Sequence, residues 1–168
     1  MSAPRDVARA AVYAAEDQVA AALDRGGAVD FFGSTLAVPQ QRRFADIASI
    51  QRYVDEVLAL AAVRLRWPEV GPVRVRERAG ARQAHYEVGR ATLAIPIAGP
   101  PPRWAARELV VLHELGHHVA PPADERPAHG AHFTGAVVAL VDAALGSAAA
   151  LLLRAAYDGA GVPVAEGR

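Results

Sequence analysis

The sequence contains no cysteine and no lysine, and each absence limits what the protein can do. Without cysteine there are no disulfide bonds and no thiolate ligands, so a metal ion can be held only by histidine and carboxylate side chains. All 18 basic residues are arginine, which we interpret, together with the heavy use of Ala, Gly and Pro, as codon bias of a GC-rich genome. The net charge of zero argues against general nucleic-acid binding.

Long apolar runs are also absent. Charged residues such as Arg5 and Asp6 leave no unbroken apolar core for a signal peptide. The apolar run 136–141 ends at Asp142 and is too short to span a membrane. We therefore expect a cytoplasmic protein that binds neither membranes nor nucleic acids. Its length predicts a single domain (1–168), whereas nothing in the sequence indicates the oligomeric state.

The segment His113-Glu114-Leu115-Gly116-His117 has the pattern HExxH. Residues four apart lie on one face of a helix, so His113 and His117 can bind one metal ion, and Glu114 is the natural general base for a metal-bound water. The largely apolar segment 107–119 lies between two proline clusters and predicts a buried helix. Buried histidines need partners, which a metal ion supplies; the alternative is two hydrogen-bonded core histidines.

Catalytic zinc usually has three protein ligands and one open position, so a third ligand is needed. The metzincin motif is excluded because the chain has Ala120 and Ala123 where that motif has Gly and His. We favour His129, which precedes a predicted helix and can turn back towards the motif. His132 is the main alternative because residues three apart lie on similar sides of a helix. Four weaker candidates are His118, Asp124, Glu125 and Asp142.

After the HExxH motif, His129-Gly130 with Phe133 resembles the third-ligand segment of SprT-like zinc peptidases. That resemblance implies that His129 is the third zinc ligand. More broadly, the chain resembles a small family of uncharacterised zinc metallohydrolases from high-GC bacteria, in the stretches 12–17, 31–33, 43–44, 51–54 and 107–118. The chain has no zinc ribbon and no basic tail, so a DNA-linked protease role does not carry over.

Hydrophobic periodicity predicts the remaining elements. We expect further helices over 4–25, 47–65, 132–145 and 148–157, a hairpin within 29–38, and strands over 73–78, 83–88 and 91–97. The predicted fold class is α+β, with a small, mostly antiparallel sheet beside the HExxH helix and with flanking helices. This matches the zincin-like metallopeptidase layout, in which strand 91–97 would border the substrate groove and accept an extended peptide as a further strand.

Several other residues are candidates for supporting roles. A developing oxyanion needs a hydrogen-bond donor, for which we favour Tyr157 over His85 and Tyr86; the alternative is an aromatic with a hydrogen-bonded hydroxyl. A ligand histidine usually donates its other N–H to a carboxylate, and Asp142 and Glu108 are candidates for that acceptor. We interpret Trp104 as a core anchor, and the three arginines of strand 73–78 as a solvated strand face rather than a site for an acidic substrate.

These observations lead to the hypothesis of a zinc-dependent hydrolase, most simply a metallopeptidase that acts on a peptide or small amide substrate. His113, His117 and His129 would bind Zn²⁺, and Glu114 would take the proton from its water. One alternative is a small-molecule amidase or deacylase. Another is a non-catalytic binding or regulatory module with a structural zinc, which a closed site with both His129 and His132 bound would support.

Overall fold

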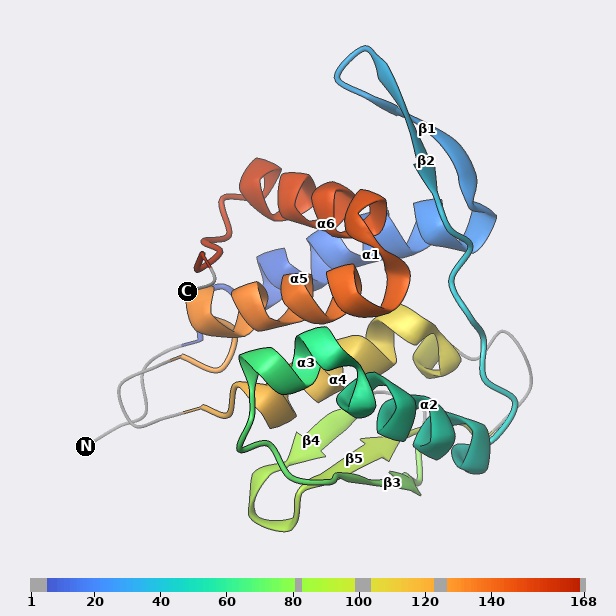
Figure 1. Cartoon of the computed structure of the whole chain (residues 1–168), viewed down its shortest axis with the longest axis vertical. Helices are drawn as coiled ribbons and strands as arrows, with labels where there is room; N and C mark the ends of the chain where they lie inside the picture. The colour runs from blue at the N-terminus through green and yellow to red at the C-terminus, as the bar shows by residue number, and fades with distance from the viewer. Residues whose placement is uncertain (1–5, 81–82, 99–103, 123–126, 167–168) are drawn as a thin grey trace.

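The computed structural model describes residues 6–80, 83–98, 104–122 and 127–166 and confirms the α+β class (Figure 1). The helices are α1 (Arg9–Arg25), α2 (Ile47–Ala59), α3 (Ala61–Arg66), α4 (Glu108–Val119), α5 (Ala131–Leu145) and α6 (Ser147–Gly159). The strands are β1 (Gly27–Phe31), β2 (Ser34–Val38), β3 (Arg74–Glu77), β4 (His85–Glu87) and β5 (Thr92–Ile95). No helix in these described ranges has the length and apolar character needed to cross a membrane.

Helix α4, which carries the HExxH motif, is the central helix of the fold. Nine of its 12 residues are buried, so the predicted buried helix is confirmed. It lies between α5 on one side and β4 and α2 on others (Figure 1). A Cβ atom on Gly116 would lie 2.6 Å from Cγ2 of Val137 in α5, so the missing side chain is what lets these two helices approach closely.

The three-stranded sheet has the order β3–β5–β4, with β5 parallel to β3 and antiparallel to β4. The sheet is therefore mixed rather than mostly antiparallel; the other antiparallel pair is the separate β1–β2 hairpin. The prediction that strand 91–97 borders the groove is wrong, because β5 is hydrogen-bonded along both edges and all of its residues are buried. Instead, β4 is the strand that lies against α4.

The helix predicted over 47–65 is two helices in the structure. α2 begins at a capping box formed by Asp46 and Ser49, and the chain leaves the helical conformation at Leu60, where φ is −58° and ψ is 136°. The break lets α2 pack on β3 while α3 packs on α5. The predicted hairpin is confirmed as β1 and β2, which project from the body at the end of α1 (Figure 1).

Candidate metal centre

Three histidines converge beside α4. His113 and His117 lie one turn apart on α4, and His129 lies immediately before α5. One ring nitrogen from each histidine lies within 4.8 Å of the other two, and Nε2 of His113 is 3.3 Å from Nε2 of His129. Among the described residues, this is the group whose donor atoms are close enough to hold a metal ion. The structure therefore brings the three predicted ligands together.

The other candidates for a third ligand lie elsewhere. His132 is exposed on α5, and Asp142 accepts a hydrogen bond from Ser147 at 2.7 Å. His118 contacts the Tyr86 hydroxyl at 3.0 Å and the Gly71 carbonyl at 2.9 Å, which agrees with the expectation that it faces away from the centre. Asp124 and Glu125 lie outside the described residues.

Two of the histidines are held by carboxylates. His113 Nδ1 lies 2.7 Å from Glu16 Oε2, and His129 Nδ1 lies 2.6 Å from Asp6 Oδ2. An ionised carboxylate only accepts, so each Nδ1 carries a proton and each neutral ring presents a lone pair on Nε2. These two lone pairs face each other at 3.3 Å. They need a cation or a further proton between them, because lone pairs at that distance repel.

The separation of the two Nε2 atoms fits a tetrahedral ion. Two ligands at zinc–nitrogen distances of about 2.0–2.1 Å lie roughly 3.3–3.4 Å apart in tetrahedral geometry, and the observed separation is 3.3 Å. The third ligand is suited to the same task. The pKa of His117 is lowered to about 2, mainly by burial and also by the nearby His113 and His129, so its lone pair is available at neutral pH.

Glu16 is the carboxylate partner of His113, a contact that the sequence did not reveal. We expected Asp142 or Glu108 as the carboxylate partner of a ligand histidine, and both expectations are wrong. Glu108 is buried but accepts a hydrogen bond from the Arg42 backbone N–H at 2.7 Å. Glu16 lies on the buried face of α1, and a carboxylate on an otherwise apolar helix face was the signal that could have identified it.

The structure does not place the Tyr157 hydroxyl at the open side of the centre. Tyr157 is fully buried in α6, and its hydroxyl donates to Glu16 Oε1 at 2.5 Å. The hydroxyl proton is therefore committed to the carboxylate that holds His113, which removes Tyr157 from direct contact with a substrate. Together, Tyr157, Glu16 and His113 form a buried hydrogen-bonded chain that links α6, α1 and α4.

Glu114 is buried beside the histidines and is 3% exposed. Its pKa is raised to about 7, mainly by burial and further by the charge of Glu16, while His113 and the Tyr86 backbone N–H in β4 act in the opposite direction. A general base works best when its pKa lies near the operating pH. Glu114 is therefore a buried carboxylate close to the three histidines, with a pKa in the range that suits a general base.

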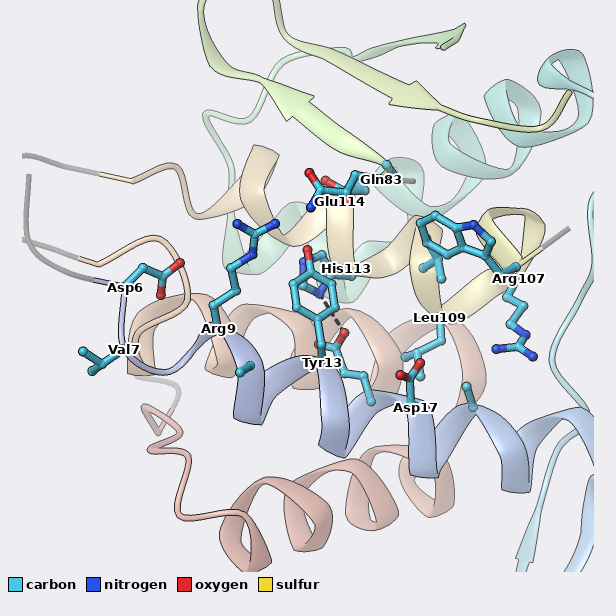
Figure 2. Close-up of a pocket in the computed structure, with 16 residues that line it drawn as sticks. Asp6, Val7, Arg9, Tyr13, Asp17, Gln83, Arg107, Leu109, His113 and Glu114 are labelled. Atoms are coloured by element: carbon cyan, nitrogen blue, oxygen red, sulfur yellow. Dashed lines mark hydrogen bonds and ion pairs between the residues drawn. The ribbon is translucent and has the colours of Figure 1, made fainter. Parts of the chain in front are cut away.

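The centre opens into a cavity of about 740 Å³. Tyr13 of α1 lines this cavity, and its ring stacks on His113 with 5.0 Å between ring centroids. The hydroxyl of Tyr13 lies on the side of Glu114 (Figure 2). Its pKa is raised to about 12, first by burial and then by Glu114, so it stays protonated at neutral pH. Tyr13 is thus a donor directed into the cavity, which the sequence analysis missed.

Other predicted residues are placed as follows. Trp104 lines the cavity and is 36% exposed, so its interpretation as a core anchor is wrong. His85 contacts the guanidinium of Arg78 at 2.6 Å, and Arg76 pairs with Glu87 within the sheet. Arg76 of β3 and Arg78 just after it therefore contact side chains of β4.

Comparison of the chain with protein-family models, with curated proteins and with solved structures found no match. The case for a function therefore rests on the geometry of this centre.

Proposed function

We propose that this chain is a zinc-dependent hydrolase of peptide or other amide bonds, with His113, His117 and His129 as the metal ligands and Glu114 as the general base. The observation that carries the proposal is the convergence of three imidazole nitrogens beside a buried carboxylate. The ligand set contains nitrogen only, which suits zinc. Two of the rings have their other nitrogen held by a carboxylate, as is usual for ligand histidines.

When bound, zinc supplies a Lewis acid that polarises a carbonyl and makes water acidic near neutral pH. The chain supplies the proton transfers and the orientation. Glu114 takes a proton from water and delivers it to the leaving amine, for which a pKa of about 7 suits both directions. Tyr13 donates a hydrogen bond to the carbonyl oxygen as negative charge develops there. Glu16 and Asp6 hold His113 and His129 in the required tautomer and orientation.

The described residues favour a catalytic site over a structural one. Three protein ligands leave a fourth position for water or substrate, whereas structural zinc sites are closed. Within the part of the chain that the structure describes, no fourth histidine or carboxylate completes the group. The cavity lies directly against His113 and Glu114, which a purely structural centre does not need.

The cavity size favours a second candidate, a small-molecule amidase or deacylase. A volume of about 740 Å³ is that of a typical small-molecule site. The buried position of β5 also leaves that strand unable to pair with an extended peptide. Short substrates therefore fit the structure better than long ones, and a substrate panel should include both acylated amines and short peptides.

The experiment that tests the proposal compares wild type with Glu114→Gln. Elemental mass spectrometry should find about one zinc per chain in both proteins. Hydrolysis of a panel of peptides and acyl-amines, followed by mass spectrometry, should fall on the order of 10²- to 10⁴-fold in the variant because the general base is lost. Glu56→Gln, which removes an exposed carboxylate on α2, is the matched control and should keep full activity. Full activity of Glu114→Gln, or a wild type that takes up no zinc, would refute the proposal.

A further inference from the structure

The cavity lies between α1 and α4, which run in opposite directions along it. Tyr13 of α1 lies against His113 of α4 in the middle of the cavity. Towards the C-terminal end of α1, the side chain of Gln41 bridges the Ala20 carbonyl and the Leu109 backbone N–H, at 3.0 and 3.1 Å. The two helices are therefore antiparallel along the cavity. One end of the cavity lies at the N-terminal part of α1, and the other end lies at the N-terminal part of α4.

Arg9 lies at the N-terminal end of α1, one helical turn before Tyr13. Its guanidinium lies 5.6 Å from the centre of the Tyr13 ring. Figure 2 shows the Arg9 side chain extending into the cavity on the side of Glu114. A guanidinium offers five N–H donors, so Arg9 can donate hydrogen bonds to a ligand in the cavity.

Of the two arginines that line the cavity, Arg107 has an ion-pair partner among the described residues and Arg9 does not. Asp6 and Glu16 each pair with a ligand histidine, and Arg107 pairs with Asp24 at 3.2 Å. Among the described residues, no carboxylate oxygen lies within ion-pairing distance of the Arg9 guanidinium. Within the described part of the chain, Arg9 is therefore the cavity arginine without a carboxylate partner, and it is placed to bind an anionic ligand.

The opposite end of the cavity carries both apolar and charged side chains. Leu109 lies there near Asp17 (Figure 2). The cavity lining also contains Val110, Ala84 and the ring of Trp104, which is 36% exposed. Arg107 also lies at this end (Figure 2) and shares the carboxylate of Asp24 with Arg43. A ligand that matches both ends carries a negative group on one side of the metal centre and an apolar group on the other.

We propose that the substrate is a short peptide or acyl-amino acid with a free carboxylate, which Arg9 binds while an apolar group occupies the Trp104 end of the cavity. The scissile amide then lies between these groups, beside His113 and Glu114. A guanidinium binds a carboxylate through two parallel hydrogen bonds, which fixes the orientation of the ligand as well as its charge. This inference rests on the proposed hydrolase function and adds the class of substrate.

The test uses the zinc-loaded full chain and a set of N-acylated dipeptides with apolar acyl groups, each made as the free acid and as the C-terminal amide. Wild type should prefer the acids, mainly through KM, and Arg9→Gln should lose on the order of 10- to 100-fold of that preference. Arg25→Gln removes an exposed arginine from the last turn of the same helix and should keep the preference. Zinc content should be unchanged in both variants, because neither removes a ligand.

Binding of the same acids and amides, measured by calorimetry, separates the inference from the proposed function. Cleavage of acids and amides with equal efficiency would overturn the carboxylate anchor and leave the hydrolase function standing. A preference that survives in Arg9→Gln would also overturn the anchor, because the carboxylate would then bind elsewhere. Acid-selective, Arg9-dependent binding with no cleavage would support the anchor and refute the hydrolase function.

Discussion

Replacing Glu16 with Gln should weaken zinc binding, although Glu16 is not a ligand. The carboxylate uses Oε2 for His113 Nδ1 and Oε1 for the Tyr157 hydroxyl, at 2.7 and 2.5 Å. Gln offers one acceptor oxygen where Glu offers two. If that oxygen faces His113, the proton of Tyr157 loses its acceptor; if it faces Tyr157, an amide N–H opposes the Nδ1–H of His113.

The size of the effect follows from these two contacts. Loss of a carboxylate behind a ligand histidine typically lowers metal affinity 10- to 100-fold, which corresponds to about 1.4–2.7 kcal/mol. The mispaired buried group also lowers the free energy of unfolding of the metal-free protein by about 1–3 kcal/mol. Tyr157→Phe removes only the hydroxyl and keeps the carboxylate on His113, so its effect on zinc affinity should be smaller than that of Glu16→Gln.

The assay is a competition titration in which a chromophoric chelator reports free zinc, with urea unfolding of each metal-free protein measured in parallel. Asp17→Asn is the matched control, since it removes the same charge at the next, exposed position of α1. Among the described residues, the carboxylates that hold the ligand histidines are Glu16 and Asp6, not Asp17. Zinc affinity of folded Glu16→Gln equal to that of Asp17→Asn would refute the reasoning, because the hydrogen bond to His113 would then contribute nothing.

Three further outcomes follow from the structure. Tyr13→Phe should lower kcat about 10²-fold through the loss of an oxyanion donor while zinc content stays the same; unchanged kcat would exclude that role. Gly116→Ala should lower the free energy of unfolding by about 1–3 kcal/mol in urea titrations, because its Cβ would lie 2.6 Å from Val137. Hydrogen bonds from Ser49 lower the pKa of the Asp46 cap, so Asp46→Ala should be less stable than wild type at pH 7. That difference should shrink as the pH falls below about 4, and a difference that is constant with pH would contradict it.

The parts of the centre that depend on local sequence could be predicted. The spacing of His113 and His117 follows from one helical turn, and the apolar surroundings of the motif predict that α4 is buried. His129 was favoured because it precedes a helix, and the structure places it beside the motif. The choice between His129 and His132 could not be made from spacing, since it depends on which side of α5 faces α4.

The parts that depend on long-range contacts could not be predicted. Glu16 lies 97 residues before His113, and Asp6 lies 123 residues before His129, so no local pattern connects them. The sheet order is also a tertiary property, because a strand's sequence does not state which neighbours it pairs with. The break between α2 and α3 at Leu60 has no Gly or Pro nearby that would predict it. It occurs because α2 and α3 pack on different partners.

The bond between Asp6 and His129 has a consequence for the order in which the protein matures during synthesis. A nascent chain that ends soon after α4 already contains the HExxH motif and Glu16, but it lacks His129. Long-range contacts of this kind form late in folding, so tight zinc uptake should wait until α5 has left the ribosome and packed against α4. Zinc binding would then indicate that the N-terminal segment with Asp6 has packed against the segment with His129.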